Sequence, residues 1–261
     1  MRIIYFLLVI IFTSSCKNKT EKIVDYSETD LDVTTSLYPD EITKVFSAHG
    51  GLDTWNSMQS LKFTKGEEVT TVNLKNRKSL IETPQHLIGF NGKAVWTKDK
   101  DTILYQGNAK FYYNLMFYFY AMPFVLADNG ITYNEVAPLV FEDKTYPGIK
   151  IAYESGVGES SDDEYVLYYN PDTFMMEWLS YTVTYFSKEK NDAFRFIRYS
   201  DWQKMDSGLL LPKTLNWYNV ENNVPTAQRN EVEFTNVALS EIKPDDTLFE
   251  MPDRAQIVEY L

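Results

Sequence analysis

The chain has very few of the residues that build covalent cross-links and metal sites. Its 261 residues include a single cysteine, Cys16, and two histidines, His49 and His86. One cysteine excludes an internal disulfide and a cysteine-rich zinc site, and two histidines leave little for a histidine-dominated metal site. The sequence also lacks a nucleotide-binding glycine loop, a G-x-S-x-G nucleophile motif and an H-E-x-x-H zinc motif. We therefore expect no cofactor.

Positive charge is also scarce. Lys and Arg number 25 and Asp and Glu number 37, so the formal net charge is -12. Charge of this sign repels the phosphates of nucleic acids, and the sequence indicates no nucleic-acid partner. Aromatic residues, by contrast, make up 15% of the chain and hydrophobic residues 44%. This composition suffices for a substantial core and favours β-structure, in which aromatic side chains are enriched.

The N-terminal region has the pattern of an export signal followed by a tether. Arg2 precedes an apolar run, residues 3–12, which is followed by small polar residues. A helix of that length covers only about half of the ~30 Å hydrocarbon core of a bilayer, so the run is typical of a secretory signal peptide and too short for a membrane span. Residues 16–37 are polar and lack a helical or strand period, which predicts a flexible tether.

Ser14, Ser15 and Cys16 resemble the end of a bacterial lipoprotein signal, where small residues precede a cysteine that becomes the lipidated N-terminus. Thr13 stands where leucine is most common in that signal. The resemblance implies that residues 1–15 are a cleaved signal peptide and that Cys16 carries lipid. It also implies more than one acyl chain, which anchors a protein stably in a membrane. The alternative is an N-terminal helix with an incidental cysteine.

Residues 38–261 are predicted to form a single domain that is mainly β (α+β). A short helix is expected near its start, because Ile42, Val45 and Phe46 follow the i, i+3, i+4 spacing of an amphipathic helix. From residue 60 on, short segments rich in β-forming residues alternate with turn residues, and residues 101–107 are one of these segments. We expect a curved antiparallel sheet or incomplete β-barrel of about eleven strands covered by a few helices.

Two turns are clear in this region. Asn91 and Gly92 stand between two apolar segments, and Asn-Gly is the strongest hairpin signal because both residues tolerate a positive φ. The second turn is predicted at residues 170–172, Asn-Pro-Asp.

One segment, residues 111–127, is apolar on every side. It holds eight aromatic residues in seventeen, and its only strongly polar side chain is Asn114. Such a segment must be buried, inserted in a membrane or covered by another surface, and its length and Pro123 argue against a membrane span. One interpretation is a central core helix. The other is a helix that closes the mouth of a concave sheet, in which case the candidates to line a ligand cavity are Phe117, Tyr118, Tyr120, Met122 and Phe124.

Four segments carry a resemblance to a known family: residues 48–64, 111–131, 146–173 and 209–218. Together they resemble a family of Bacteroidota lipoproteins without an established activity, and the likeness extends from about residue 38 to the end of the chain. The architecture of that family is similar to the LolA/LolB type of outer-membrane lipoprotein-sorting proteins. The resemblance implies a half-barrel covered by helices, with an apolar cavity for acyl chains.

Carriers of the LolA type use an arginine that faces the cavity. The candidates in this sequence are Arg77, Arg195 and Arg198, and no local motif distinguishes them. Lys17, which follows the cysteine, resembles the residue found in lipoproteins directed to the outer membrane. The periplasmic and surface faces of that membrane both stay open.

The acidic loop at residues 154–164 offers weak candidates for a metal site. Glu159, Asp162 and Asp163 lie close together there, and calcium prefers several oxygen ligands in flexible loops. The loop lacks the alternating ligands of an EF-hand, and acidic loops are usually solvated, so we expect no metal. For His49 and His86 a structural role is favoured, because His49 is placed at a helix end and His86 in a strand.

These observations lead to one main hypothesis and two alternatives. The main hypothesis is a membrane-anchored lipoprotein of the bacterial cell envelope, at the outer membrane, that binds a lipid or another hydrophobic ligand in a half-barrel cavity. Its partners would be the membrane, through the lipid anchor, and this apolar ligand. The first alternative is a non-enzymatic structural or protein-interaction module. The second is an envelope hydrolase, which would need convergent acids or a His–acid pair in a cleft.

Overall fold

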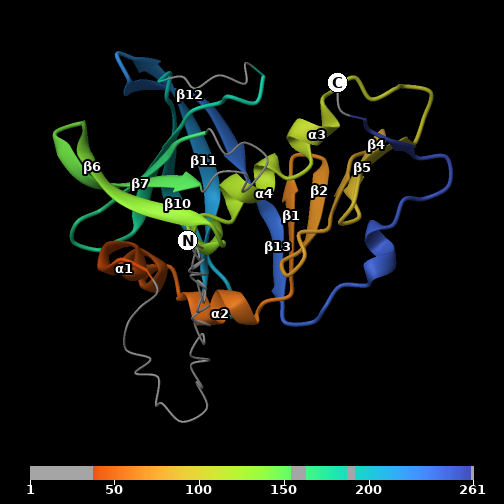
Figure 1. The fold of residues 1–261 in the computed structure, drawn as a ribbon, viewed down its shortest axis with the longest axis horizontal. Coiled ribbons are helices and arrows are strands. Elements are labelled where there is room, and N and C mark those ends of the chain that lie inside the picture. The colour runs from red at the N-terminus through yellow and green to blue at the C-terminus, as the bar shows by residue number, and fades with distance from the viewer. Residues whose placement is uncertain (1–37, 154–162, 187–191, 260–261) are drawn as a thin grey trace, which may run out of the picture. The chain divides into compact units, whose positions relative to one another are not determined.

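The computed structural model describes residues 38–153, 163–186 and 192–259, all of which belong to one compact unit, residues 36–261. Cys16, Glu159 and Asp162 lie outside the described residues. The described strands form two seven-stranded antiparallel sheets, neither of which closes into a barrel, together with a few short helices (Figure 1). The mainly antiparallel β-fold with unclosed sheets is therefore confirmed, although the described residues hold fourteen strands and not about eleven.

The first sheet has the strand order β13-β1-β2-β3-β4-β5-β14, and all of its pairs are antiparallel. Its strands are β1 (Ser60–Lys65), β2 (Glu68–Asn73), β3 (Ser79–Glu82), β4 (His86–Phe90), β5 (Val95–Asp99), β13 (Thr235–Ser240) and β14 (Gln256–Ile257). Consecutive strands from β1 to β5 are neighbours, so this part of the sheet is a meander, as the regular spacing of the turn residues predicts.

The second sheet has the strand order β12-β11-β10-β9-β8-β7-β6 and is a meander along its whole width. Its strands are β6 (Ile131–Phe141), β7 (Lys144–Tyr153), β8 (Tyr165–Tyr169), β9 (Met176–Tyr181), β10 (Arg195–Lys204), β11 (Leu210–Glu221) and β12 (Val224–Glu233). The predicted turn at residues 170–172 joins β8 to β9, and the Asn170 Oδ1 atom accepts hydrogen bonds from the backbone N–H groups of Asp172 and Thr173.

The chain passes directly from one sheet to the other at Phe234. This residue lies between β12 and β13, its side chain is buried, and its N–H donates to the Lys213 carbonyl at 2.8 Å. Phe234 belongs to one large hydrophobic cluster that also contains buried side chains of both sheets, among them Phe63 of β1 and Leu215 of β11. The two sheets therefore share a core.

Two sequence predictions about the strands need correction. The excess over eleven strands arises partly at the end of the chain, where Phe234 separates β12 from β13 and where β14 joins the edge of β5. Residues 101–107, predicted as a strand, form a loop, because the edge of β5 that they would have to join is paired with β14. A β-forming composition does not give a strand where no sheet edge is free.

The helices at the start of the domain agree with the sequence. Helix α1 (Asp40–Ala48) buries Ile42, Val45 and Phe46, and it ends before two glycines with positive φ. Helix α2 (Leu52–Ser57) places Trp55 in the core. The predicted helix with Ile42, Val45 and Phe46 on its buried face is therefore confirmed.

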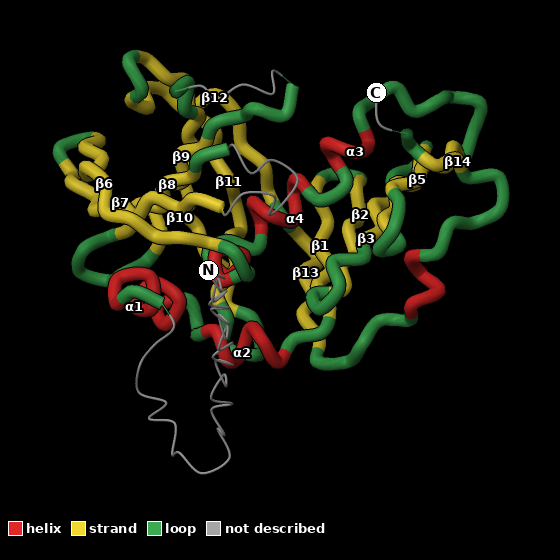
Figure 2. Tube along the Cα trace, viewed as in Figure 1, coloured by secondary structure: helices red, strands yellow, loops and turns green. Residues whose placement is uncertain are grey.

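The aromatic segment is not the single helix that its composition suggests. It forms three short pieces: α3 (Ala109–Tyr112), α4 (Leu115–Tyr120) and the 3-10 helix η1 (Phe124–Ala127). Pro123 supplies no N–H for a continuing helix, which limits α4 at its C-terminal side. Figure 2 shows α4 between the strands of the two sheets. Among the described residues, no helix is both long and apolar enough to span a membrane.

Candidate ligand pocket

The five side chains predicted to line a cavity pack against protein atoms. Phe117, Tyr120, Met122 and Phe124 are buried in the large core cluster, and Tyr118 is half-buried at its margin. The Tyr120 ring lies 4.5 Å from that of Phe63 and 4.3 Å from that of Phe234, and the Phe124 ring stacks on Trp55 at 4.8 Å. These contacts come from β1, from the connection between the two sheets and from α2, so α4 and η1 form part of the core.

The polar groups in and around this segment have partners inside the protein. The Tyr199 hydroxyl donates to the Phe119 carbonyl at 2.8 Å, and the Tyr38 hydroxyl donates to the Ala127 carbonyl at 3.1 Å. Gln203 Nε2 donates to the Tyr120 hydroxyl at 3.2 Å. Burial raises the pKa of both Tyr120 and Tyr199 well above the ordinary tyrosine range, so both hydroxyls stay protonated.

Of the three arginines considered, Arg77 contacts the aromatic segment. Its guanidinium lies 5.2 Å from the centre of the Phe117 ring and pairs with the Asp128 carboxylate. Burial raises the pKa of Asp128, and the nearby Arg77 opposes this rise. Arg198 instead lies over the rings of Phe141 and Trp178, in a second cluster on the other face of the second sheet.

A pocket of about 320 Å³ lies at the beginning of the aromatic segment. Its walls come from the β4–β5 hairpin, from α3 and the residue after it, and from the C-terminal strand β14 with the two residues that follow. The apolar lining consists of Phe90, Ala94, Val95, Tyr113, Ile257 and Val258. The charged lining, as far as the described residues go, consists of Lys93, Lys110 and Glu259. The aromatic segment therefore fills the core with α4 and η1 and walls a pocket with α3.

The β4–β5 hairpin holds its side of the pocket in a fixed backbone conformation. Asn91 Oδ1 accepts hydrogen bonds from the N–H groups of Lys93 and Ala94, each at 3.0 Å, and Gly92 has a φ of 90°. This confirms the hairpin that the Asn-Gly pair predicts, although its connection is longer than two residues because β5 begins only at Val95. Lys93 is part of this turn, so its side chain is attached to the fixed backbone.

Helix α3 is fixed by three kinds of contact although it is only four residues long. Asn108 caps it, because its Oδ1 accepts from the Phe111 N–H at 3.0 Å. The Tyr112 hydroxyl donates to Glu68 Oε2 and accepts from Lys65 Nζ, both at 2.8 Å, which ties α3 to the β1–β2 hairpin. Tyr113 packs against Phe90, with the ring centres 5.0 Å apart.

The third wall depends on the C-terminal segment that crosses the other face of the first sheet. The 3-10 helix η2 (Asp246–Phe249) buries Phe249 against Trp96, whose Nε1 donates to the Phe249 carbonyl at 3.1 Å. Beyond η2 the Val258 N–H donates to the Val95 carbonyl at 2.9 Å. Phe249 and Val258 therefore hold the segment that carries Ile257 and Glu259 to the pocket.

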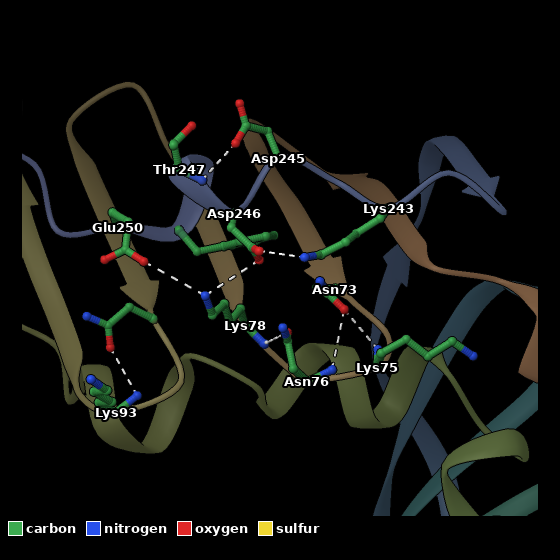
Figure 3. A network of polar contacts seen from close by, with 12 residues as sticks. Asn73, Lys75, Asn76, Lys78, Lys93, Lys243, Asp245, Asp246, Thr247 and Glu250 are labelled. Carbon is green, nitrogen blue, oxygen red and sulfur yellow. Dashed lines mark hydrogen bonds and ion pairs between the residues drawn. The ribbon is translucent and has the colours of Figure 1, made fainter.

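A polar network supports η2 from outside (Figure 3). Lys78 Nζ lies 3.5 Å from Asp246 Oδ1 and 3.8 Å from Glu250 Oε1, and Lys243 Nζ donates to Asp246 Oδ2 at 2.6 Å. Asp245 caps η2 by accepting from the Thr247 N–H at 2.9 Å. The lysines hold the pKa of the Asp246 carboxyl below its ordinary value. Each exposed pair contributes little alone, but together they fix the position of η2.

Asp163 and His86, two further candidates from the sequence, form hydrogen bonds within the protein. Asp163 is buried and accepts a hydrogen bond from the Thr184 N–H at 2.6 Å, which pins a loop end. No group of three or more His, Cys, Asp or Glu side chains able to hold a metal occurs in the described part of the chain. His86 Nδ1 lies 3.1 Å from Asp99 Oδ1, and that same oxygen accepts from the Tyr105 N–H at 2.9 Å. The His86–Asp99 pair thus links β4, β5 and the following loop.

The pocket residues could not be found from the sequence. The local signals were the Asn-Gly turn before Lys93 and the aromatic residues around Tyr113, but neither points to Ile257 or Val258. These positions meet because β14 joins the edge of β5 after the chain has built the whole second sheet. Strand order at a sheet edge is a long-range property that periodicity does not reveal.

No curated protein matches the chain. Solved structures similar to it include a DUF1329 family protein from Desulfovibrio piger, with a TM-score of 0.47 and 13% identity, covering 81% of this chain and 98% of that one. A putative outer membrane lipoprotein-sorting protein domain from Vibrio parahaemolyticus has a TM-score of 0.37 and 7% identity, covering 74% and 93%. A LolA superfamily protein from Nitrosomonas europaea has a TM-score of 0.35 and 8% identity, covering 74% and 87%.

A family model gives a match over most of the sequence. It extends over residues 2–233, which include the apolar N-terminal run, the aromatic segment and all of the second sheet. The chain belongs to DUF6503, a family of unknown function.

Proposed function

We propose that this protein is a membrane-anchored lipoprotein of the bacterial cell envelope, at the outer membrane, that binds a hydrophobic ligand. The anchor would be lipid on Cys16 after removal of residues 1–15, and residues 16–37 would connect it to the folded unit. The ligand would occupy the pocket between the β4–β5 hairpin, α3 and β14. The protein would act as a binding protein without catalysing a reaction.

The observation that carries the proposal is the pocket itself. Its volume of about 320 Å³ lies at the lower end of the ~300–1,000 Å³ typical of small-molecule sites, and most of its lining side chains are apolar. Ile257 is 58% exposed at its margin, so apolar surface continues from the interior to the outside. An apolar ligand would cover this surface and gain about 25 cal/mol per Å² of area removed from water.

The pocket replaces the site proposed from the sequence. Tyr120, Met122 and Phe124 would have to leave a close-packed core to admit a ligand, which costs several kcal/mol for side chains of this size. Tyr113, at the other end of the aromatic segment, already lines an open space. Binding beside Tyr113 requires no such rearrangement.

Filling the pocket from its margin tests this proposal. We expect Ile257→Trp to abolish the binding of decanol, measured by isothermal titration calorimetry, because the larger ring would occupy the space of the ligand. The matched control is Ile242→Trp, at a residue that is 78% exposed and does not line the pocket. Equal binding by both variants would show that the ligand binds elsewhere or that the pocket binds none.

A structural or protein-interaction module is the second candidate, and one observation favours it. Phe186 is 67% exposed, and its ring lies 5.0 Å from that of Phe111 and 5.1 Å from that of Tyr185. An exposed aromatic group of this kind is typical of a contact with another protein. Under this alternative, Phe186→Ser would impair function in cells, whereas Ile257→Trp would not.

A further inference from the structure

The charged side chains of the pocket define the class of ligand more narrowly than its apolar walls do. Among the described residues of the lining, Lys93 and Lys110 contribute two positive charges and Glu259 contributes one negative charge. The chain as a whole carries a formal charge of -12. Salt screens charges beyond a Debye length of about 8 Å at physiological ionic strength. In so acidic a protein, anions are therefore attracted only close to the two lysines.

Both lysines project from backbone that is held in place. Lys93 follows a turn closed by two hydrogen bonds to Asn91 Oδ1, and Lys110 lies on a helix capped by Asn108. Backbone that is already ordered reduces the entropy that must be lost when a ligand is bound. The two ammonium groups are therefore carried by fixed walls, on the hairpin and on α3.

Two other lysines near this part of the sheet, Lys78 and Lys243, pair with acids. Figure 3 shows Lys78 and Lys243 joined to Asp246 and Glu250, whereas Lys93 is joined through its backbone to the turn. Within the described residues, the ion pairs of the first sheet do not include Lys93. A cation at the margin of an apolar pocket is suited to an anionic group attached to an apolar chain.

We propose that the ligand is a single-chain amphiphile with an anionic head, whose apolar chain lies along Phe90, Tyr113 and Ile257 and whose head contacts Lys93 and Lys110. This inference rests on the function proposed above and deepens it. Glu259 limits the affinity, because its carboxylate lies in the same pocket as the anionic head and repels it. Carboxylate and phosphate heads share this chemistry.

Three probes with the same chain separate the effect of charge from that of apolar burial: decanoate, decyl phosphate and decanol. We expect Lys93→Gln together with Lys110→Gln to weaken decanoate and decyl phosphate binding by about tenfold or more, because hydrogen bonds to charged groups are lost. Decanol binding should change by less than about twofold. Whichever anion binds more tightly to the unmodified protein identifies the head.

Two controls sharpen the test. Lys98→Gln removes the same charge from β5, on the face that carries Trp96, and should leave binding of all three probes unchanged. Glu259→Gln should strengthen the binding of both anions and not that of decanol. Equal weakening of decanol and decanoate by the two lysine substitutions, or an equal effect of Lys98→Gln, would overturn the inference. Failure of all three probes to bind the unmodified protein would instead overturn the proposed function.

Discussion

His49 lies buried at the end of α1 with both ring nitrogens in hydrogen bonds. Nδ1 lies 2.7 Å from the Val45 carbonyl, which only accepts, and Nε2 lies 3.4 Å from the Met176 N–H, which only donates. The ring is therefore neutral, with its proton on Nδ1. Burial lowers the pKa of His49 to about 4, although the Val45 carbonyl opposes this shift. The residue joins α1 to the second sheet.

This environment predicts a pH dependence of stability. The folded pKa lies below the unfolded value of about 6.5, so between pH 6.5 and 4 the unfolded chain binds a proton that the folded chain does not. Stability contributed by neutral His49 is complete above pH 6.5 and falls by about 2 kcal/mol at pH 5. Urea unfolding at pH 7.5 and pH 5 measures this loss. The His49→Gln variant should have a lower free energy of unfolding than the unmodified protein at pH 7.5, and this free energy should fall less between pH 7.5 and pH 5. An equal fall in both proteins would contradict the neutral, buried state of His49.

Gly89 is required by the side chain of Trp96. A Cβ at this position would lie 2.1 Å from Trp96 Cζ2, and the indole is buried and hydrogen-bonded to the Phe249 carbonyl. We expect Gly89→Ala to destabilise the protein by about 1–3 kcal/mol, because overpacking a close-packed site forces atoms to move. Thermal unfolding measures the effect. Trp96→Phe removes the clashing ring atoms, so Gly89→Ala should cost less in that background, and equal costs in the two backgrounds would refute the explanation.

At the scale of elements, the C-terminal segment stabilises the first sheet and completes the pocket. Phe249 is fully buried against Trp96 and Leu80, whereas its neighbour Leu248 is 42% exposed. We expect Phe249→Ala to lower the free energy of unfolding by about 3–5 kcal/mol, and Leu248→Ala by about 0.5 kcal/mol or less. Hydrogen exchange should show faster exchange of the Val258 amide in the first variant only. Similar exchange in both variants would show that η2 does not hold β14.

Some elements were predictable from sequence because their signals are local. The burial of Ile42, Val45 and Phe46 follows from helical spacing, and the β4–β5 hairpin follows from Asn91 and Gly92. The division of the aromatic segment was not predictable, because a segment that is apolar on all sides carries no periodicity to show where a helix breaks. The loop at residues 101–107 was missed because its fate depends on β14, more than a hundred residues away.

The candidate site was likewise predictable only in part. The sequence leaves two interpretations of residues 111–127 open, a core helix or a helix that closes a concave sheet with Phe117 and Tyr120 lining a ligand cavity. In the structure both side chains are buried in the large core cluster. The pocket uses Tyr113 from the same segment with residues from two other parts of the chain. The location of the pocket depends on which strand pairs with the edge of β5, and this pairing is a long-range property of the fold.

At the scale of the whole molecule, the proposed lipid on Cys16 determines where the protein lies in the cell. Cys16→Ser removes the sulfur that would carry the acyl chains, so we expect the variant to move from the membrane fraction to the soluble fraction. Fractionation after a high-salt wash measures this shift, and Ser15→Ala is a control that keeps both a small residue and the cysteine. A Cys16→Ser protein that still sediments with membranes would refute the anchor.

Native mass spectrometry of the protein extracted from its own cell envelope tests the anchor and the ligand together. We expect a covalent mass that begins at Cys16 and carries acyl chains, together with a non-covalent amphiphile that is released on denaturation and is absent from Ile257→Trp. A covalent mass that begins at Met1, with no acyl addition and no bound amphiphile, would contradict both the lipid anchor and the ligand.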